Sequence, residues 1–211
     1  MATKRKVGNL LALAVLSYLV QRPMHPYELS RTLRDNGDAR SIKFNHGTLY
    51  MVVQQLEKAG FIAAQETNRE GLRPERTVYA LTEAGRHELR DWLRELIGEP
   101  EHEYPAFVAA LSLIGALPPS QVLPQLRHRL QRLAEDAAEI RRLVDKTLAD
   151  GVPELFLVEE QYRLALNAAE STFVTSLIDR ILDPDNGWGQ MWAKFHGETP
   201  PDPGKGKKAK T

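Results

Sequence analysis

The chain has 211 residues, 42% of them hydrophobic, and its 28 Lys and Arg balance its 28 Asp and Glu, so one or two domains with a sizeable core are expected. No apolar run approaches the roughly 18 residues that a membrane span needs, so no membrane partner is expected. The absence of cysteine excludes disulfides, thiol catalysis and thiolate zinc sites, and it favours a cytoplasmic location.

Three helices are predicted in the first sixty residues. Leucines and valines from Leu10 to Leu19 make the first helix apolar on nearly every side, so it is expected to be buried, with an interface between two subunits as one possibility. A second helix is expected from about Pro26 to Asp35. The third begins near Asn45, ends at Gly60, a residue suited to a left-handed cap, and has an apolar stripe at i, i+3, i+4 and i+7, namely Leu49, Val52, Val53 and Leu56.

The sequence period then changes to that of a β-hairpin. Phe61–Thr67 and Thr77–Leu81 are predicted as strands, separated by a polar loop that contains Arg69, Arg73 and Arg76. Thr82 is a suitable N-cap for a fourth helix. Three helices, a two-stranded hairpin and a further helix, in this order, are typical of a winged helix-turn-helix.

The second half is predicted to be helical. A short apolar helix is expected over 107–117, followed by a long helix capped by Ser120. The long helix has a coiled-coil seam with steps of three and four residues, and a regular seam of this kind needs partner helices to bury it. We assign its larger members to dimerisation: Leu123, Leu126, Leu130, Leu133, Ile140 and Val144. A second long helix, from about Glu154 to Leu182, completes an antiparallel hairpin with a similar stripe of Leu155, Val158, Tyr162, Ala165, Ala169 and Phe173.

The predicted fold class is therefore mainly α, a winged helix-turn-helix domain followed by an α-helical hairpin dimerisation domain. The domains are residues 1–98 for DNA binding, 104–196 for dimerisation and 197–211 as a disordered basic tail. Residues 1–98 contain 15 basic and 11 acidic residues, whereas 99–211 contain 13 and 17. This division of charge favours contact of a polyanion with the first half.

The outer side of the third helix suits a DNA major groove. It carries mainly amide, hydroxyl and imidazole groups, the types that read base edges, rather than the Glu and Lys of a routine solvated face. We assign DNA contacts to Tyr27 and Lys43 at the backbone, to Arg73 and Arg76 at phosphates, and to base-reading positions on the third helix, namely Asn45, His46, Thr48, Tyr50 and Gln54. For Tyr50 an alternative is that the ring packs against the wing and only supports the helix.

Four runs in residues 9–95 carry a family resemblance: Pro23–Leu29, Gly47–Tyr50, Leu56–Ile62 and Arg73–Gly85. With these runs the chain resembles the PadR family of transcriptional regulators, although Pro26 stands where that family usually has Gly, and Leu72 interrupts its Gly-Arg-Pro wing motif. The resemblance implies a homodimeric repressor of an inverted-repeat operator in double-stranded DNA. It also implies release by a small aromatic or planar effector, bound between the domains near Trp92 and the long helices.

Several alternatives remain open beside this interpretation. Trp188, Met191, Trp192 and Phe195 form a helical stripe, which packs on the helical domain or across the dimer, or covers an effector pocket that includes Trp92, Trp188 and Trp192. None of the six histidines has metal-ligand spacing, and no nucleotide or hydrolase motif is present, so neither a metal, a cofactor nor an enzymatic activity is expected. The competing functions are a regulator of the MarR type, a helical interaction protein whose winged helix no longer binds DNA, and a small-molecule sensor or carrier without an operator.

Overall fold

The computed structural model describes residues 5–65 and 77–201, and the chain divides into two compact units, residues 1–103 and 104–211. The described residues are mainly helical and include one two-stranded antiparallel sheet, which confirms the predicted fold class. Among these residues no helix is both long enough and apolar enough to cross a membrane.

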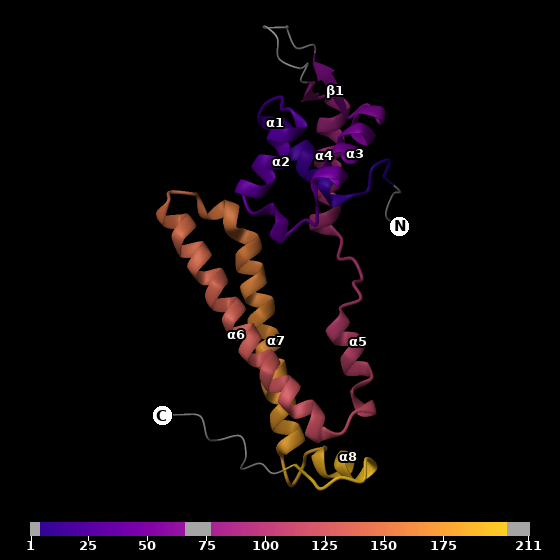
Figure 1. Cartoon of the computed structure of the whole chain (residues 1–211), viewed down its shortest axis with the longest axis vertical. Helices are drawn as coiled ribbons and strands as arrows, with labels where there is room; N and C mark the ends of the chain where they lie inside the picture. The colour runs from indigo at the N-terminus through magenta and orange to yellow at the C-terminus, as the bar shows by residue number, and fades with distance from the viewer. Residues whose placement is uncertain (1–4, 66–76, 202–211) are drawn as a thin grey trace. The chain divides into compact units, whose positions relative to one another are not determined.

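The N-terminal unit has the predicted order of elements (Figure 1). These are α1 (Leu10–Gln21), α2 (Pro26–Asp35), a 3-10 turn (Asp38–Arg40), α3 (His46–Lys58), β1 (Ile62–Gln65), β2 (Val78–Leu81) and α4 (Glu83–Gly98). In the hairpin, Ile62 pairs with Leu81 and Gln65 pairs with Val78. The polar loop of the predicted wing lies outside the described residues.

Helix α1 is the centre of the N-terminal core. It contacts α2, α3, α4 and β2, and Leu11, Val15 and Leu16 are fully buried. The α3 stripe packs into the same cluster, together with Leu29, Leu33, Leu89 and Trp92. Neighbours within one chain therefore account for the apolar character of α1, and no second subunit is required to bury it.

The junction of α4 with the hairpin depends on the missing side chain of Gly85. A Cβ at this position would lie 2.0 Å from the Phe61 carbonyl oxygen and 2.7 Å from Leu81 Cδ1. The hydroxyl of Thr82 accepts a hydrogen bond from the Gly85 N–H, so Thr82 caps α4 as predicted. Only glycine allows the first turn of α4 to lie this close to the backbone of Phe61, the residue before β1.

Replacing Gly85 with Ala is expected to lower the free energy of unfolding by about 1–3 kcal/mol, because the added methyl group must push the backbone of Phe61 away. The matched control is Gly98→Ala at the other end of α4, where a Cβ would meet nothing within 4 Å. The control should change stability by less than about 1 kcal/mol. Urea unfolding of both variants measures the difference, and equal effects would contradict the close contact at Gly85.

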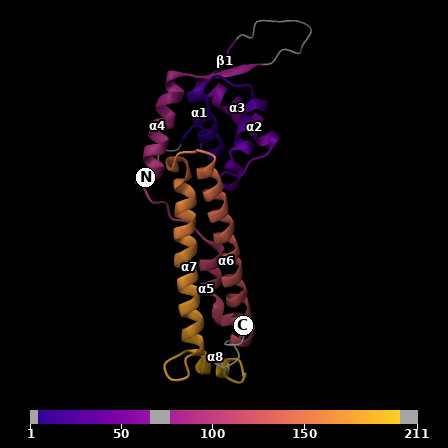
Figure 2. The same cartoon turned by 90° about the vertical axis from the view of Figure 1, so that its left-hand side faces the viewer.

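The C-terminal unit is built on two long helices that lie side by side and antiparallel (Figures 1 and 2). Its elements are α5 (Ala106–Ser112), a 3-10 turn (Ile114–Ala116), α6 (Pro119–Ala149), a 3-10 turn (Glu154–Leu157), α7 (Val158–Leu182) and α8 (Gly189–Phe195). The predicted cap of α6 is wrong. Pro118 occupies the N-cap position without a side-chain cap, and the Ser120 hydroxyl instead donates to Glu198 at 2.8 Å.

The seam of α6 is covered by α7 of the same chain. Leu123, Leu126 and Ile140 are buried, whereas Leu130, Leu133 and Val144 are half-buried. From α7 the contacts come from Val174, Leu177, Ile178 and Ile181. The residues assigned to dimerisation thus have partners within the hairpin, and their contact with a second chain stays a prediction.

The apolar stripe noted in the sequence of the second long helix does not face α6, because its residues lie on the opposite side of α7. The exposed members are Leu155, Val158, Tyr162, Ala165, Ala169 and Phe173, and Leu166 is exposed beside them. At about 100° per residue, the positions within α7 fall on one side of the helix, and Leu155 lies in the 3-10 turn before it. Helix α7 therefore has two apolar sides, one packed on α6 and one open.

Candidate nucleic-acid interface

Helix α3 begins with a reciprocal cap. The side-chain oxygen of Asn45 accepts from the Thr48 N–H, and the Thr48 hydroxyl accepts from the Asn45 N–H, each at 2.9 Å. The same hydroxyl donates to the Asn45 carbonyl oxygen at 2.9 Å. Both hydrogen-bonding functions of Thr48 thus serve the start of the helix, and a base contact by this residue would compete with the cap.

The opposite side of α3 from the buried stripe is polar and open. His46 and Gln54 are exposed, and Tyr50 is half-buried. The rings of His46 and Tyr50 are stacked, with centroids 4.8 Å apart and planes 6° from parallel. Met51 and Gln55 are exposed beside them. The structure therefore brings His46, Tyr50 and Gln54 together on one surface.

The residues assigned to backbone contacts lie on two segments that precede this surface. Tyr27 is exposed in the first turn of α2, where its N–H donates to Nδ1 of His25 at 3.0 Å. Lys43 is exposed just before α3. Arg73 and Arg76 lie outside the described residues.

The connection from α2 to α3 is tied to α1 through Tyr18. The Tyr18 hydroxyl donates to Asp38 and accepts from the Asn36 amide at 2.9 Å. Burial, together with the hydrogen bond to Asp38, raises the pKa of Tyr18 to about 12, so the hydroxyl stays protonated at neutral pH. This network fixes the turn that leads into α3.

Tyr79 is a positioning residue that we did not assign to a site from the sequence. Its backbone exchanges two hydrogen bonds of 3.0 Å with Met24, ahead of α2, and its hydroxyl bonds the carboxylate of Glu57 in α3. Burial and the charge of Glu57 raise the pKa of Tyr79. Tyr79 thus ties the base of the hairpin to α3 and holds these two elements in a fixed relation.

The three tryptophans assigned to an effector pocket lie in two units. Trp92 is buried in the N-terminal core, with the Arg5 guanidinium 5.3 Å from its ring centroid. Arg5 is held there by ion pairs to Glu88 and Glu95 on α4. Trp188 and Trp192 line a cavity of about 450 Å³ in the C-terminal unit. Within the part of the chain that the structure describes, no group of three His, Asp or Glu is suited to hold a metal ion.

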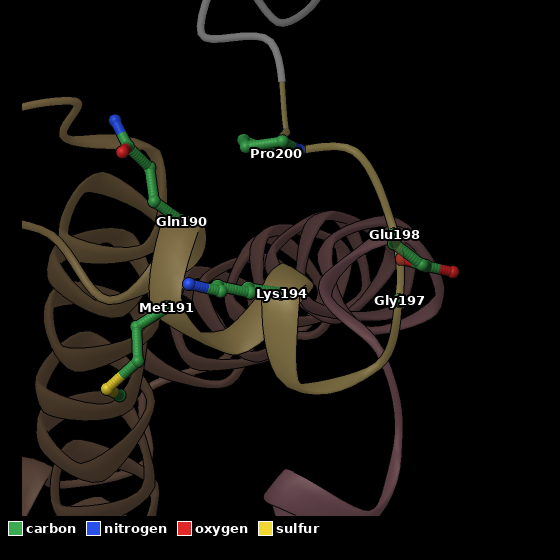
Figure 3. A pocket seen from close by; sticks show the side chains of 6 residues that line it. All are labelled: Gln190, Met191, Lys194, Gly197, Glu198 and Pro200. Atoms are coloured by element: carbon green, nitrogen blue, oxygen red, sulfur yellow. The ribbon is translucent and has the colours of Figure 1, made fainter.

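A second cavity of about 530 Å³ lies beside α8 and includes both charged and apolar side chains in its lining (Figure 3). Figure 3 shows that its lining comes from α8 and from the segment that follows it: Gln190, Met191, Lys194, Gly197, Glu198 and Pro200.

Comparisons with known proteins agree with this geometry. Residues 15–91 match the model of the "Transcriptional regulator PadR-like family". The chain is 25% identical over 149 residues to the "Negative transcriptional regulator PadR" of Bacillus subtilis (strain 168). The aligned region covers 70% of this chain and 80% of the relative.

Solved structures share the fold. The crystal structure of Bacillus subtilis PadR in complex with operator DNA matches with a TM-score of 0.65 at 19% identity, over 81% of this chain and 98% of the other. The same protein in complex with p-coumaric acid gives a TM-score of 0.65 at 17% identity, over 84% and 97% of the two chains. The Vibrio cholerae virulence activator AphA gives 0.59 at 16% identity, over 80% and 95%.

Proposed function

Because this chain is a PadR-like transcriptional regulator, we propose that it is a repressor that binds an inverted-repeat operator as a homodimer and is released by a small aromatic effector. The observation that carries the proposal is the outward side of α3. His46, Tyr50 and Gln54 stand together there, on a helix held by its cap and by Tyr79. Such a regulator acts in the cytoplasm, where its operator lies.

The contacts divide into two groups. Gln54, Tyr50 and His46 read base edges, because they lie on the outward side of α3 and their polar atoms are not used by the cap. Asn45 and Thr48 mainly build the start of the helix. Tyr27 and Lys43 contact the DNA backbone, and Arg73 and Arg76 neutralise phosphates.

The homodimer is supported by the open apolar side of α7. Tyr162 is 65% exposed, Leu166 52% and Phe173 49%, which is unusual for large apolar side chains along one side of a helix. A second copy would bury this stripe against its own, as a two-fold interface requires. Two winged helices would then face two operator half-sites.

The effector part of the proposal is supported by the crystal structure of the Bacillus protein in complex with p-coumaric acid, a small aromatic molecule. A ligand that weakens operator binding 100-fold must prefer the non-binding form by about 2.7 kcal/mol. It would favour a dimer whose recognition helices no longer match the half-site spacing.

The test is a mobility-shift titration of the full chain on the DNA upstream of its own gene, with a shuffled duplex as control. Specific retardation that small aromatic compounds, charged or neutral, reverse supports the proposal. Equal, salt-sensitive binding to both duplexes contradicts an operator-specific repressor. The absence of any shift favours the alternative, a winged-helix interaction or ligand-sensing protein without DNA-binding activity.

Replacing Arg73 or Arg76 with Ala is expected to weaken binding to all sequences alike, because a phosphate contact carries no base information. Each lost contact should lower the slope of log affinity against log salt by about one. Operator affinity measured at two salt concentrations reports both quantities. Arg132→Ala, an exposed arginine of α6, serves as control and should change neither, whereas a change in base preference at the wing variants would reverse the assigned roles.

A further inference from the structure

The apolar cavity of the C-terminal unit has the features of a small-molecule site. It is lined by the turn before α6, the end of α7 and one side of α8, through Ile114, Gly115, Leu177, Trp188, Met191, Trp192 and Phe195. Its volume of about 450 Å³ lies in the range of ligand pockets. We propose that this cavity, lying wholly within the C-terminal unit, binds an uncharged planar aromatic molecule.

The walls of the cavity are held by a tight turn between α7 and α8. The Trp188 N–H donates to the Arg180 carbonyl oxygen at 3.1 Å, and the Arg180 guanidinium lies 4.1 Å from the centroid of the Trp188 ring. A Cβ on Gly189 would lie 2.1 Å from the Ile181 carbonyl oxygen, so the first residue of α8 must be glycine to pack this closely. The turn thus fixes the position of Trp188 before any ligand binds.

A second set of contacts holds the far end of α8. Nε2 of His196 lies 2.9 Å from the Gly115 carbonyl oxygen, in the turn before α6. The Ser120 hydroxyl donates to Glu198 at 2.8 Å. Trp192 packs into the core of the hairpin with 8% of its surface exposed. The aromatic walls therefore come from a helix that is anchored at both ends, so little ordering is needed on binding.

The lining determines the class of ligand. None of the seven residues carries a charge, and three of them are aromatic rings. The lining offers a charged group no ion-pair partner, whereas a flat neutral ring can stack on the tryptophans. The second cavity beside α8 differs in this respect, because Lys194 and Glu198 place charged groups in its lining (Figure 3).

Two dyes that share one scaffold test the proposal on the full chain in the absence of DNA. N-phenyl-1-naphthylamine is neutral, and 1-anilinonaphthalene-8-sulfonate is the same molecule with a sulfonate. We expect the neutral dye to bind at least about tenfold more tightly, measured by fluorescence titration. Equal or tighter binding of the sulfonate, or no binding of the neutral dye, would overturn the proposal.

Two variants locate the binding. Gly115→Leu should weaken binding of the neutral dye at least about tenfold, because a Cβ there meets nothing within 4 Å and the larger side chain would occupy part of the cavity. Gly98→Leu in the N-terminal unit is its control, since a Cβ there also meets nothing within 4 Å. Phe195→Ala should weaken binding of the neutral dye several-fold, whereas Phe156→Ala, an exposed phenylalanine outside the lining, should not.

Unchanged dye binding by both cavity variants would overturn the proposal. A fall in the mass of the assembly by light scattering for Gly115→Leu or Phe195→Ala would also overturn it, because the cavity would then be a protein contact. The inference rests on the proposed function only for its consequence, release from the operator. If the neutral dye binds but the chain does not retard operator DNA, the proposed regulator is refuted and the cavity remains a ligand site. If the chain retards operator DNA but the dye does not bind, only the ligand site is refuted.

Discussion

A double substitution on the open side of α7, Leu166→Asp with Phe173→Asp, is expected to convert the proposed dimer into a monomer. Both side chains are about half exposed in the single chain, at 52% and 49%. A two-fold interface would bury each of them twice, so the variant places four unpaired carboxylates in the contact. We expect the dimer dissociation constant to rise at least about 1,000-fold, because central interface positions commonly cost 2 kcal/mol or more each.

The loss of the dimer should in turn reduce operator affinity by about 10²–10⁴-fold, since the second half-site would no longer be bound by the same molecule. Light scattering and operator titration measure the two effects. Thr175→Asp adds one carboxylate on another side of α7 and should leave the dimer and the operator affinity unchanged. Circular dichroism should show unchanged helicity, and a variant that remains a dimer would place the contact elsewhere.

Substitutions in the α6 seam should change the stability of the hairpin and not the dimer contact. Leu126 is buried against α7 of the same chain, so Leu126→Ala should lower the stability of the hairpin by about 2–5 kcal/mol. It should affect dimerisation only through that loss. A folded Leu126→Ala monomer would instead support the assignment of the seam to dimerisation.

The second large effect is expected at Gln54. Its amide is exposed on α3 and can form two hydrogen bonds with an adenine edge. Gln54→Ala should cost about 1–3 kcal/mol per half-site, and therefore about 30-fold to 10⁴-fold in operator affinity for a dimer on two half-sites. The preference for one base pair in each half-site should be lost at the same time.

The measurement is operator affinity against a panel of single mismatches at two salt concentrations. Gln125→Ala, an exposed glutamine of α6, is the control. If Gln54→Ala weakens every duplex equally, the residue contacts the DNA backbone and not a base.

Thr48→Ala separates a cap from a base contact. Because the Thr48 hydroxyl serves the start of α3, its removal should lower the free energy of unfolding by about 1 kcal/mol. Operator affinity should fall without a change in base preference. A changed preference would show that Thr48 leaves the cap to read a base.

Local sequence signals were sufficient for the elements of the N-terminal unit. The stripe of Leu49, Val52, Val53 and Leu56 and the glycine at 60 gave the bounds of α3, because periodicity and capping act within one or two turns. Thr82 predicted the start of α4 for the same reason. The start of α6 was predicted at Ser120, but the helix begins at Pro119 with Pro118 as its N-cap residue. Proline suits the first position of a helix without any side-chain cap.

Tertiary structure decided what each surface meets. The stripe through Tyr162 and Phe173 has the correct helical period, yet α6 packs on the opposite side of α7. Periodicity identifies an apolar side of a helix but not its neighbour, and α7 has two such sides. Periodicity likewise does not reveal that Arg5, from a distant segment, covers the ring of Trp92. It also does not reveal that the hydrogen bond between Tyr79 and Glu57 joins β2 to α3. The sequence thus determined the elements and their order, whereas contacts between residues far apart in the chain decided which side chains are left open to a ligand, to DNA or to a second copy.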